Sequence, residues 1–183
     1  MNIVILLPKF ILTGPVKGAL AIGKLLSDNN KVIFIFLKGN INFNPKEYGH
    51  IKFITLKRNK NYIMKVFKLR NEIKKIKQDR DSTTILLSMC FSADLISLLT
   101  FDLVPRISSI RGNLIKNYQY NYRFFGKFLA IFHLSILRFF NKVIVMNKTM
   151  KNQVKNFSSK DSIIIPNFID ENIVSNYFNK RIS

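Results

Sequence analysis

The residues directly after one short apolar run are of the types best suited to hold an anion. Arg111, Gly112 and Asn113 follow residues 105–110, which we expect to form a strand. An arginine here can bind a phosphate or carboxylate through two parallel hydrogen bonds, and the adjacent glycine lets a ligand approach the backbone. We therefore predict that these three residues bind substrate. The alternative is a turn with an exposed arginine and a glycine at positive φ.

A second candidate lies in the first loop, where Gly14 precedes Pro15 at the start of an expected helix. The free N–H groups of a helix N-terminus and its partial positive charge favour a phosphate or carboxylate. The glycines at 14, 18 and 23 do not match G-x-G-x-x-G, and no Walker A sequence is present, which argues against nicotinamide and P-loop sites. We predict that Gly14 contacts substrate, with a plain turn before a helix as the alternative.

Other residues of catalytic type are few. His133 lies in a run of phenylalanines and leucines, which favours a core or interfacial position over catalysis, and His50 precedes an expected strand. Cys90 is the single cysteine, which excludes a disulfide within the chain and fits a reducing compartment. The histidines and the cysteine lack the spacing of metal ligands. We predict no metal and no tightly bound cofactor, and we assign no catalytic residue.

The formal net charge of +20 on 183 residues predicts an acidic partner, unless the lysines are only solvated surface charge. Residues 57–80 hold ten basic residues, and an aromatic-rich segment at 118–132 also carries basic side chains. Both patterns fit an anionic membrane surface. No nucleic-acid-binding motif is present, so we expect no nucleic acid partner. The membrane-facing residues that we predict on the helix over 62–78 are Lys65, Lys68, Lys74, Lys75 and Lys77.

These candidates must be positioned by strands and helices that alternate along the chain. Strands are expected at 2–7, 31–39, 51–56, 83–88, 105–110, 142–146 and 162–166, and helices at 16–30, 62–78, 92–100, 118–140 and 147–157. This alternation predicts an α/β fold, doubly wound around a mainly parallel sheet with helices on both faces. Ligands bind such sheets at the carboxyl ends of the strands, so we expect the site among the loops 8–15, 88–92 and 110–117. We expect no membrane-spanning segment, because the apolar run 124–140 is short and charged.

Taken in order, these segments resemble the N-terminal, acceptor-side domain of family-4 glycosyltransferases of the GT-B fold. The resemblance is carried by the first strand and its glycine loop, the R-G-N turn, FNKVIVMNKTMKNQV and the closing I-P-N-F-I-D at 165–170. It implies a Rossmann-like domain over 1–170, with Asn167 and Asp170 at an interdomain hinge and 171–183 starting the linker. Many members have a histidine near the position of the R-G-N turn, so the catalytic base is not identified.

The resemblance also implies a function. Members transfer a sugar, here a hexose, from a nucleotide-sugar co-substrate, and the acceptor expected here is lipid-linked or polysaccharide, in bacterial surface-glycan synthesis at the inner face of the plasma membrane. The family's donor-binding domain carries two glutamates separated by seven residues, a pair that this sequence lacks. We therefore expect that domain in cis or in trans, and an inactive chain without it. The alternative is a non-catalytic half-protein or remnant that serves as a binding module for a separate donor domain.

Overall fold

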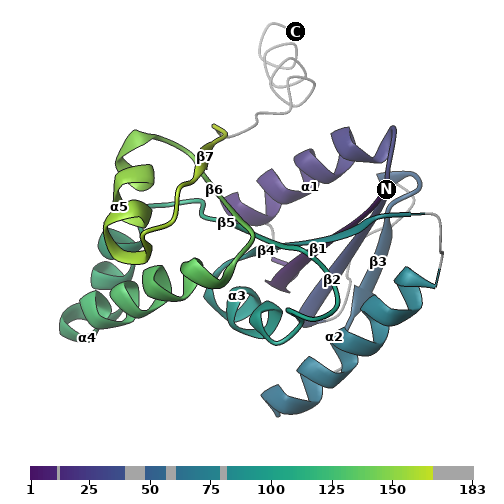
Figure 1. The fold of residues 1–183 in the computed structure, drawn as a ribbon, viewed down its shortest axis with the longest axis horizontal. Helices are drawn as coiled ribbons and strands as arrows, with labels where there is room; N and C mark the ends of the chain where they lie inside the picture. The colour runs from purple at the N-terminus through teal and green to yellow at the C-terminus, as the bar shows by residue number, and fades with distance from the viewer. Residues whose placement is uncertain (12, 40–47, 57–60, 79–81, 167–183) are drawn as a thin grey trace, which may run out of the picture.

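The computed structural model describes residues 1–11, 13–39, 48–56, 61–78 and 82–166, which fold around one parallel sheet (Figure 1). The strands are β1 Asn2–Lys9, β2 Lys31–Lys38, β3 Lys52–Thr55, β4 Thr84–Met89, β5 Arg106–Ser109, β6 Lys142–Val145 and β7 Ile163–Ile164. Their order is β3-β2-β1-β4-β5-β6-β7, and every neighbouring pair is parallel. This arrangement confirms the expected doubly wound α/β class, with the reversal of strand order between β1 and β4.

Helices cover both faces of the sheet because its central strands are apolar on both sides. The helices are α1 Gly14–Ser27, α2 Tyr62–Lys77, α3 Phe91–Leu98, α4 Leu114–Ile136, the 3-10 turn η2 Leu137–Phe139 and α5 Lys148–Ser158. Along β1, Ile3, Ile5 and Leu7 pack on the α1 side. Val4 and Leu6 pack on the side of α2 and α3. The side chains of β1 therefore lie in two hydrophobic cores, one on each face of the sheet, which explains its unbroken apolar sequence.

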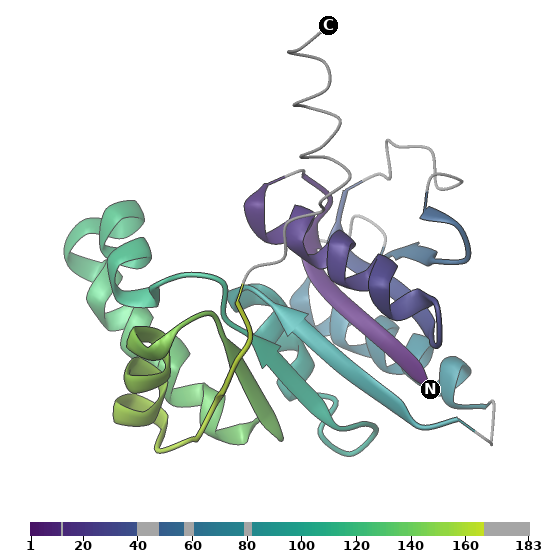
Figure 2. The ribbon, with the colours of Figure 1, turned by 90° about the horizontal axis from the view of Figure 1, so that it is seen from above.

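A third core lies at the β6 end of the sheet, where α4 and α5 pack together (Figure 2). Leu134, Leu137, Val143 and Val154 are among its buried members. No helix of the described residues is long and apolar enough to cross a bilayer.

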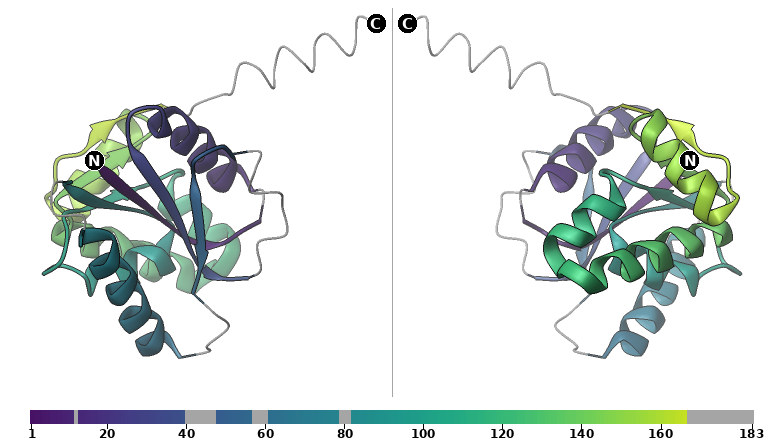
Figure 3. Two further views of the ribbon diagram at one scale, coloured as in Figure 1. Left: turned by 90° about the vertical axis from the view of Figure 1, so that its right-hand side faces the viewer. Right: turned by 90° about the vertical axis from the view of Figure 1, so that its left-hand side faces the viewer.

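Helix α4 differs from its prediction at both ends and in the middle. It begins at Leu114 rather than 118, because Asn113 caps it by accepting a hydrogen bond from the Lys116 N–H at 3.0 Å. It is also bent at Arg123, whose φ of 49° and ψ of −123° are not helical. The bend divides α4 into a first arm over 114–122 and a second arm over 124–136 (Figure 3).

Helix α2 faces the sheet differently from the predicted basic face. Lys65, predicted to face a membrane, is only 1% exposed, whereas Ile63 is 65% exposed. Burial lowers the pKa of Lys65, and the charge of Lys38 adds to this effect. The buried face is centred on Leu69 and Ile73, and at 100° per residue Ile63 lies about 120° away from Leu69.

The four other lysines of the predicted basic face lie nearer to solvent. Lys68 is half-buried, and Lys74, Lys75 and Lys77 are exposed. Lys75 pairs with Glu72 at 2.9 Å, and Lys77 donates a hydrogen bond to the carbonyl of Leu103 at 2.7 Å. Two of these four lysines are therefore hydrogen-bonded to groups of the domain itself.

Candidate functional site

A cavity of about 460 Å³ lies at the carboxyl ends of β4 and β5. Its walls come from the loop after each of these strands, the first arm of α4, His133 of the second arm, and the beginnings of α1 and α2. This is the edge of the sheet where doubly wound folds bind ligands. The cavity therefore lies among the loops in which the site was predicted.

Two of the four predicted substrate-binding residues line the cavity, namely Arg111 and Gly112. Arg111 is half-buried, and burial lowers the pKa of its guanidinium. Its Nη1 donates to the carbonyl of Pro166 at 3.5 Å, which links the loop after β5 to the segment after β7. A Cβ on Gly112 would overlap the Asn117 side-chain amide, so the missing side chain leaves room for that amide at the cavity wall.

Gly14 and Asn113 lie near the cavity without being among the residues that line it. Gly14 is exposed in the first turn of α1, and it is the next residue, Pro15, that lines the cavity. The side-chain oxygen of Asn113 accepts hydrogen bonds from the Lys116 N–H and from Gln153 Nε2, both at 3.0 Å. Contact of these two residues with substrate stays a prediction. The hinge residues Asn167 and Asp170 lie outside the described residues.

A buried polar network beside the cavity is centred on Asp94, which was not among the residues predicted from the sequence. This carboxylate on α3 is 0% exposed. It accepts hydrogen bonds from the hydroxyl groups of Ser88 on β4 and Ser108 on β5, the latter at 3.0 Å. His133 Nε2 lies 2.8 Å from the same carboxylate. An aspartate in the first turn of a helix that directly follows a strand was the available sequence indication.

His133 connects this carboxylate to the cavity. Its side chain is 1% exposed, and its Nδ1 lies 3.1 Å from the hydroxyl of Tyr118. Because the Asp94 carboxylate only accepts hydrogen bonds, His133 donates through Nε2, and in the neutral imidazole Nδ1 is then the atom that accepts from the Tyr118 hydroxyl. Sequence reasoning favoured a core position for His133, and the residue is indeed buried, but it also contributes to the cavity wall.

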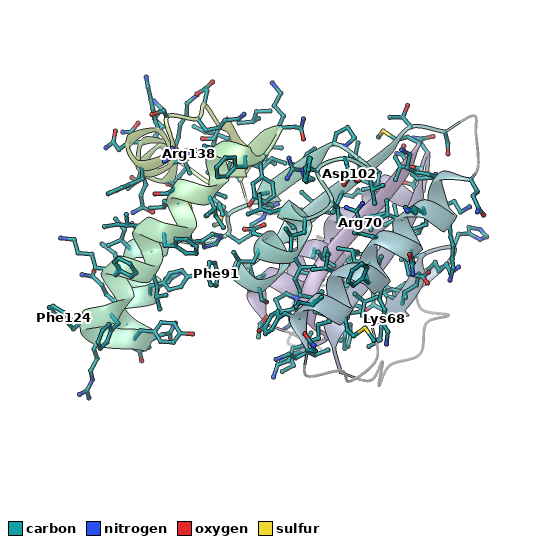
Figure 4. All side chains as sticks on the ribbon, turned by 60° about the horizontal axis from the view of Figure 1, so that its bottom comes forward. Lys68, Arg70, Phe91, Asp102, Phe124 and Arg138 are labelled. Carbon is teal, nitrogen blue, oxygen red and sulfur yellow. The ribbon has the colours of Figure 1, made fainter. Side chains whose placement is uncertain are left out.

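Tyr118 stands at the cavity end of this chain of hydrogen bonds. Burial raises the pKa of its hydroxyl, and the negative charge of Asp94 raises it further. Its ring meets Phe91 edge to face, with 6.1 Å between the ring centroids, and Figure 4 places Phe91 between α3 and α4. The aromatic contact holds the first arm of α4 against the beginning of α3.

Cys90, at the beginning of α3, lines the cavity with an unusual backbone. Its φ of 76° and ψ of 152° are rare for a residue with a side chain. Desolvation raises the pKa of its thiol to about 11, and the charge of Asp94 contributes. A thiol with this pKa is a poor nucleophile at neutral pH. Among the described residues, no three histidine, cysteine, aspartate or glutamate side chains are grouped so that they could hold a metal ion.

The fold and the position of the cavity define a class, the Rossmann-like half of the GT-B fold. No protein-family model and no curated protein sequence matches the chain. The solved structures that resemble it share little sequence with it. Apo UGT2 of Phytolacca americana has a TM-score of 0.65 and 7% identity, with 95% of this chain and 53% of that chain covered. HepE of Anabaena, solved with UDP and glucose, has a TM-score of 0.64 and 14% identity, with coverage of 98% and 50%.

A UDP-GlcNAc 2-epimerase of Methanocaldococcus jannaschii is also similar, with a TM-score of 0.59, 13% identity and coverage of 91% and 46%. The chain therefore spans about half the length of the structures that it matches. An epimerase shares this architecture with UGT2 and HepE, so the likeness establishes the fold, and the chemistry has to be argued from the site.

Proposed function

We propose that this chain is the acceptor-binding half of a family-4 glycosyltransferase. The complete enzyme would transfer a hexose from a nucleotide-sugar donor to a lipid-linked or polysaccharide acceptor in bacterial surface-glycan synthesis. The observation that carries the proposal is the cavity at the ends of β4 and β5, with Arg111 and Gly112 in its wall. The order of sequence motifs from the first strand to I-P-N-F-I-D supports the family.

The mixture of groups around the cavity suits an acceptor that joins a sugar to a phosphate. The rings of Tyr62, Phe91 and Tyr122 provide apolar faces, and the amide of Asn117 provides hydrogen bonds for hydroxyl groups. Arg111 provides the positive charge for a phosphate. The nucleotide part of the donor is assigned to a second domain, reached in cis through the hinge at Asn167 and Asp170 or supplied in trans.

The surface around the same cavity supports the proposed position on the inner face of the plasma membrane. Large apolar side chains are exposed at the beginning of α2 and around the bend of α4, and Figure 4 shows Phe124 at this bend on the side away from the sheet. Basic side chains stand among them, which suits anionic headgroups. The exposed apolar residues include Tyr62, Ile63, Met64 and Phe67 on α2 and Tyr120, Phe124, Phe125 and Phe128 on α4.

Ligand binding to the chain itself tests the acceptor assignment. The probes are a soluble short-chain prenyl phosphate carrying a sugar, and UDP, with backbone amide shifts recorded by NMR. We expect the prenyl-linked sugar to shift the amides of Gly112 and Asn117, and UDP to leave them unchanged. Arg111→Gln should weaken binding about tenfold or more through loss of a charge-assisted contact. Arg138→Gln, an exposed change outside the cavity wall, is the matched control.

The opposite pattern, with UDP shifting the cavity amides and the prenyl-linked sugar without effect, would exclude an acceptor half. If neither probe binds, the non-catalytic or remnant interpretation gains support.

The membrane position has its own test. Flotation with vesicles of neutral lipid, and of the same lipid with added phosphatidylglycerol, should show binding that requires the anionic lipid. Changing both Phe124 and Phe125 to serine should reduce vesicle binding, because each phenylalanine side chain that enters the lipid contributes about 1.5–3 kcal/mol to the binding free energy. Binding that ignores both the lipid charge and these two residues would exclude the proposed surface.

A further inference from the structure

The network of Asp94, His133 and Tyr118 runs from the buried core to the cavity. Asp94 is fully buried, His133 is held between the other two side chains, and Tyr118 is half-buried in the cavity wall. The order carboxylate, imidazole, hydroxyl is the order of a proton relay, in which the carboxylate fixes the tautomer of the imidazole and stabilises its protonated form.

We propose that Tyr118 accepts the proton from a hydroxyl group bound in the cavity, while His133 takes the proton of Tyr118 and Asp94 balances the resulting charge. The proposal rests on the proposed function, because the hydroxyl in question is that of the sugar acceptor. Tyr118 is then the residue that touches substrate, and His133 and Asp94 act through it.

The step balances with no further reactant than the donor. A bond forms between the acceptor oxygen and the anomeric carbon of the donor sugar, and the bond from that carbon to the phosphate oxygen breaks. The acceptor proton passes to the Tyr118 oxygen as the Tyr118 proton passes to His133 Nδ1. The nucleoside diphosphate leaves with the electron pair of the broken bond.

The surroundings of Tyr118 favour a relay over a free phenolate. Burial and the charge of Asp94 raise its pKa, so the hydroxyl stays protonated at neutral pH. The other groups that face it are Tyr122, whose ring stacks at 5.9 Å, and the thiol of Cys90. Among these neighbours, only the imidazole of His133 has a nitrogen lone pair that can take the proton.

Acetylation by N-acetylimidazole tests the relay in the chain alone, without any sugar donor. The reagent transfers its acetyl group to a phenol oxygen as the phenol loses its proton, and peptide mass spectrometry measures the extent at each tyrosine. Tyr120, in the same arm of α4 and 90% exposed, is the internal reference. Burial and a raised pKa by themselves predict that Tyr118 reacts far more slowly than Tyr120. With the relay, we expect Tyr118 to react at least as fast.

Two variants separate the relay from a structural role. In His133→Gln and in Asp94→Asn, the ratio of Tyr118 to Tyr120 acetylation should fall about tenfold or more, since a positioned base contributes about 10²–10⁴ in rate. Loss of structure would instead bring the ratio to about one, whereas loss of the relay in a folded chain should take the ratio well below one. A wild-type Tyr118 that reacts tenfold more slowly than Tyr120, or a ratio that does not fall in a cooperatively folded variant, overturns the relay. Because no acceptor is used, such a failure leaves the acceptor-binding test unaffected.

Discussion

Gly126 lies directly against the backbone carbonyl of Tyr118, so closely that a Cβ on the glycine would overlap the carbonyl atoms. The two residues belong to opposite arms of α4, on either side of the bend at Arg123. This backbone contact brings the arms near enough for the Tyr118 hydroxyl to reach His133 Nδ1 at 3.1 Å. The glycine is therefore part of the reason that the cavity has its polar wall.

Gly126→Ala should destabilise the domain, because the added methyl group meets rigid backbone and forces the arms apart. We expect a loss of about 1–3 kcal/mol in the free energy of unfolding, measured by urea denaturation. Gly18→Ala is the matched control, since a Cβ there meets no atom within 4 Å. That helical change should stabilise by about 0.5–1 kcal/mol. Equal effects of the two changes would contradict the close contact.

Two neighbouring serines on β5 should respond differently to the same change. The Ser108 hydroxyl donates to the Asp94 carboxylate at 3.0 Å, whereas the buried Ser109 hydroxyl has no hydrogen-bond partner among the described residues. Ser108→Ala should lower the free energy of unfolding by about 1.5–3 kcal/mol, the range for a hydrogen bond to a charged group. Ser109→Ala should be neutral or stabilising. Equal losses in urea denaturation would show that Ser109 has a partner after all.

Arg70 on α2 and Asp102 after α3 form a two-pronged ion pair, with both nitrogen-to-oxygen distances at 2.6 Å (Figure 4). The hydrogen bonds from Arg70 lower the pKa of Asp102 to about 2. In the unfolded chain the pKa of an aspartate is about 4. The ion pair therefore stabilises the fold above that pH, and this stabilisation is lost as the pH falls towards 2.

Asp102→Asn should therefore lower the melting temperature at pH 7 and flatten the loss of stability between about pH 4 and pH 2. Thermal unfolding followed by circular dichroism across this range measures both effects. Asp161→Asn is the comparison. The hydrogen bond from Lys151 also lowers the pKa of Asp161, but the side chain is 81% exposed, so solvent screening should make its effect smaller. A wild-type melting temperature independent of pH in this window would contradict the lowered pKa.

The thiol of Cys90 should react slowly even though the residue is exposed at the cavity. A pKa of about 11 leaves little thiolate at neutral pH. With iodoacetamide at pH 7.5 we expect alkylation about one hundredfold slower in the folded chain than in urea, in proportion to the thiolate fraction. Mass spectrometry over time gives both rates. Comparable rates in the two conditions would mean that Asp94 and desolvation do not act on the thiol.

Much of the fold was accessible from local sequence, because burial on both faces of a parallel sheet demands unbroken apolar strands. Residues 2–7 and 31–38 satisfy this demand and pair in register as β1 and β2. The position of the cavity followed from the same topology, and Arg111 and Gly112 fall in its wall. Helix orientation was less predictable, as Lys65 shows, since a polar residue inside a helical pattern gives no sign of its own burial.

The sequence by itself determined the class of fold and the edge of the sheet where the cavity lies, because hydrophobic periodicity and the alternation of strands and helices are properties of local sequence. Only the tertiary structure decided which polar groups meet there. Asp94 and His133 are 39 residues apart, and they lie in hydrogen-bond contact because α3 and the second arm of α4 pack side by side. Tyr118 joins them only because α4 bends at Arg123. Such contacts depend on how helices dock, and docking is set by the shapes of whole packed surfaces rather than by the spacing of residues along the chain.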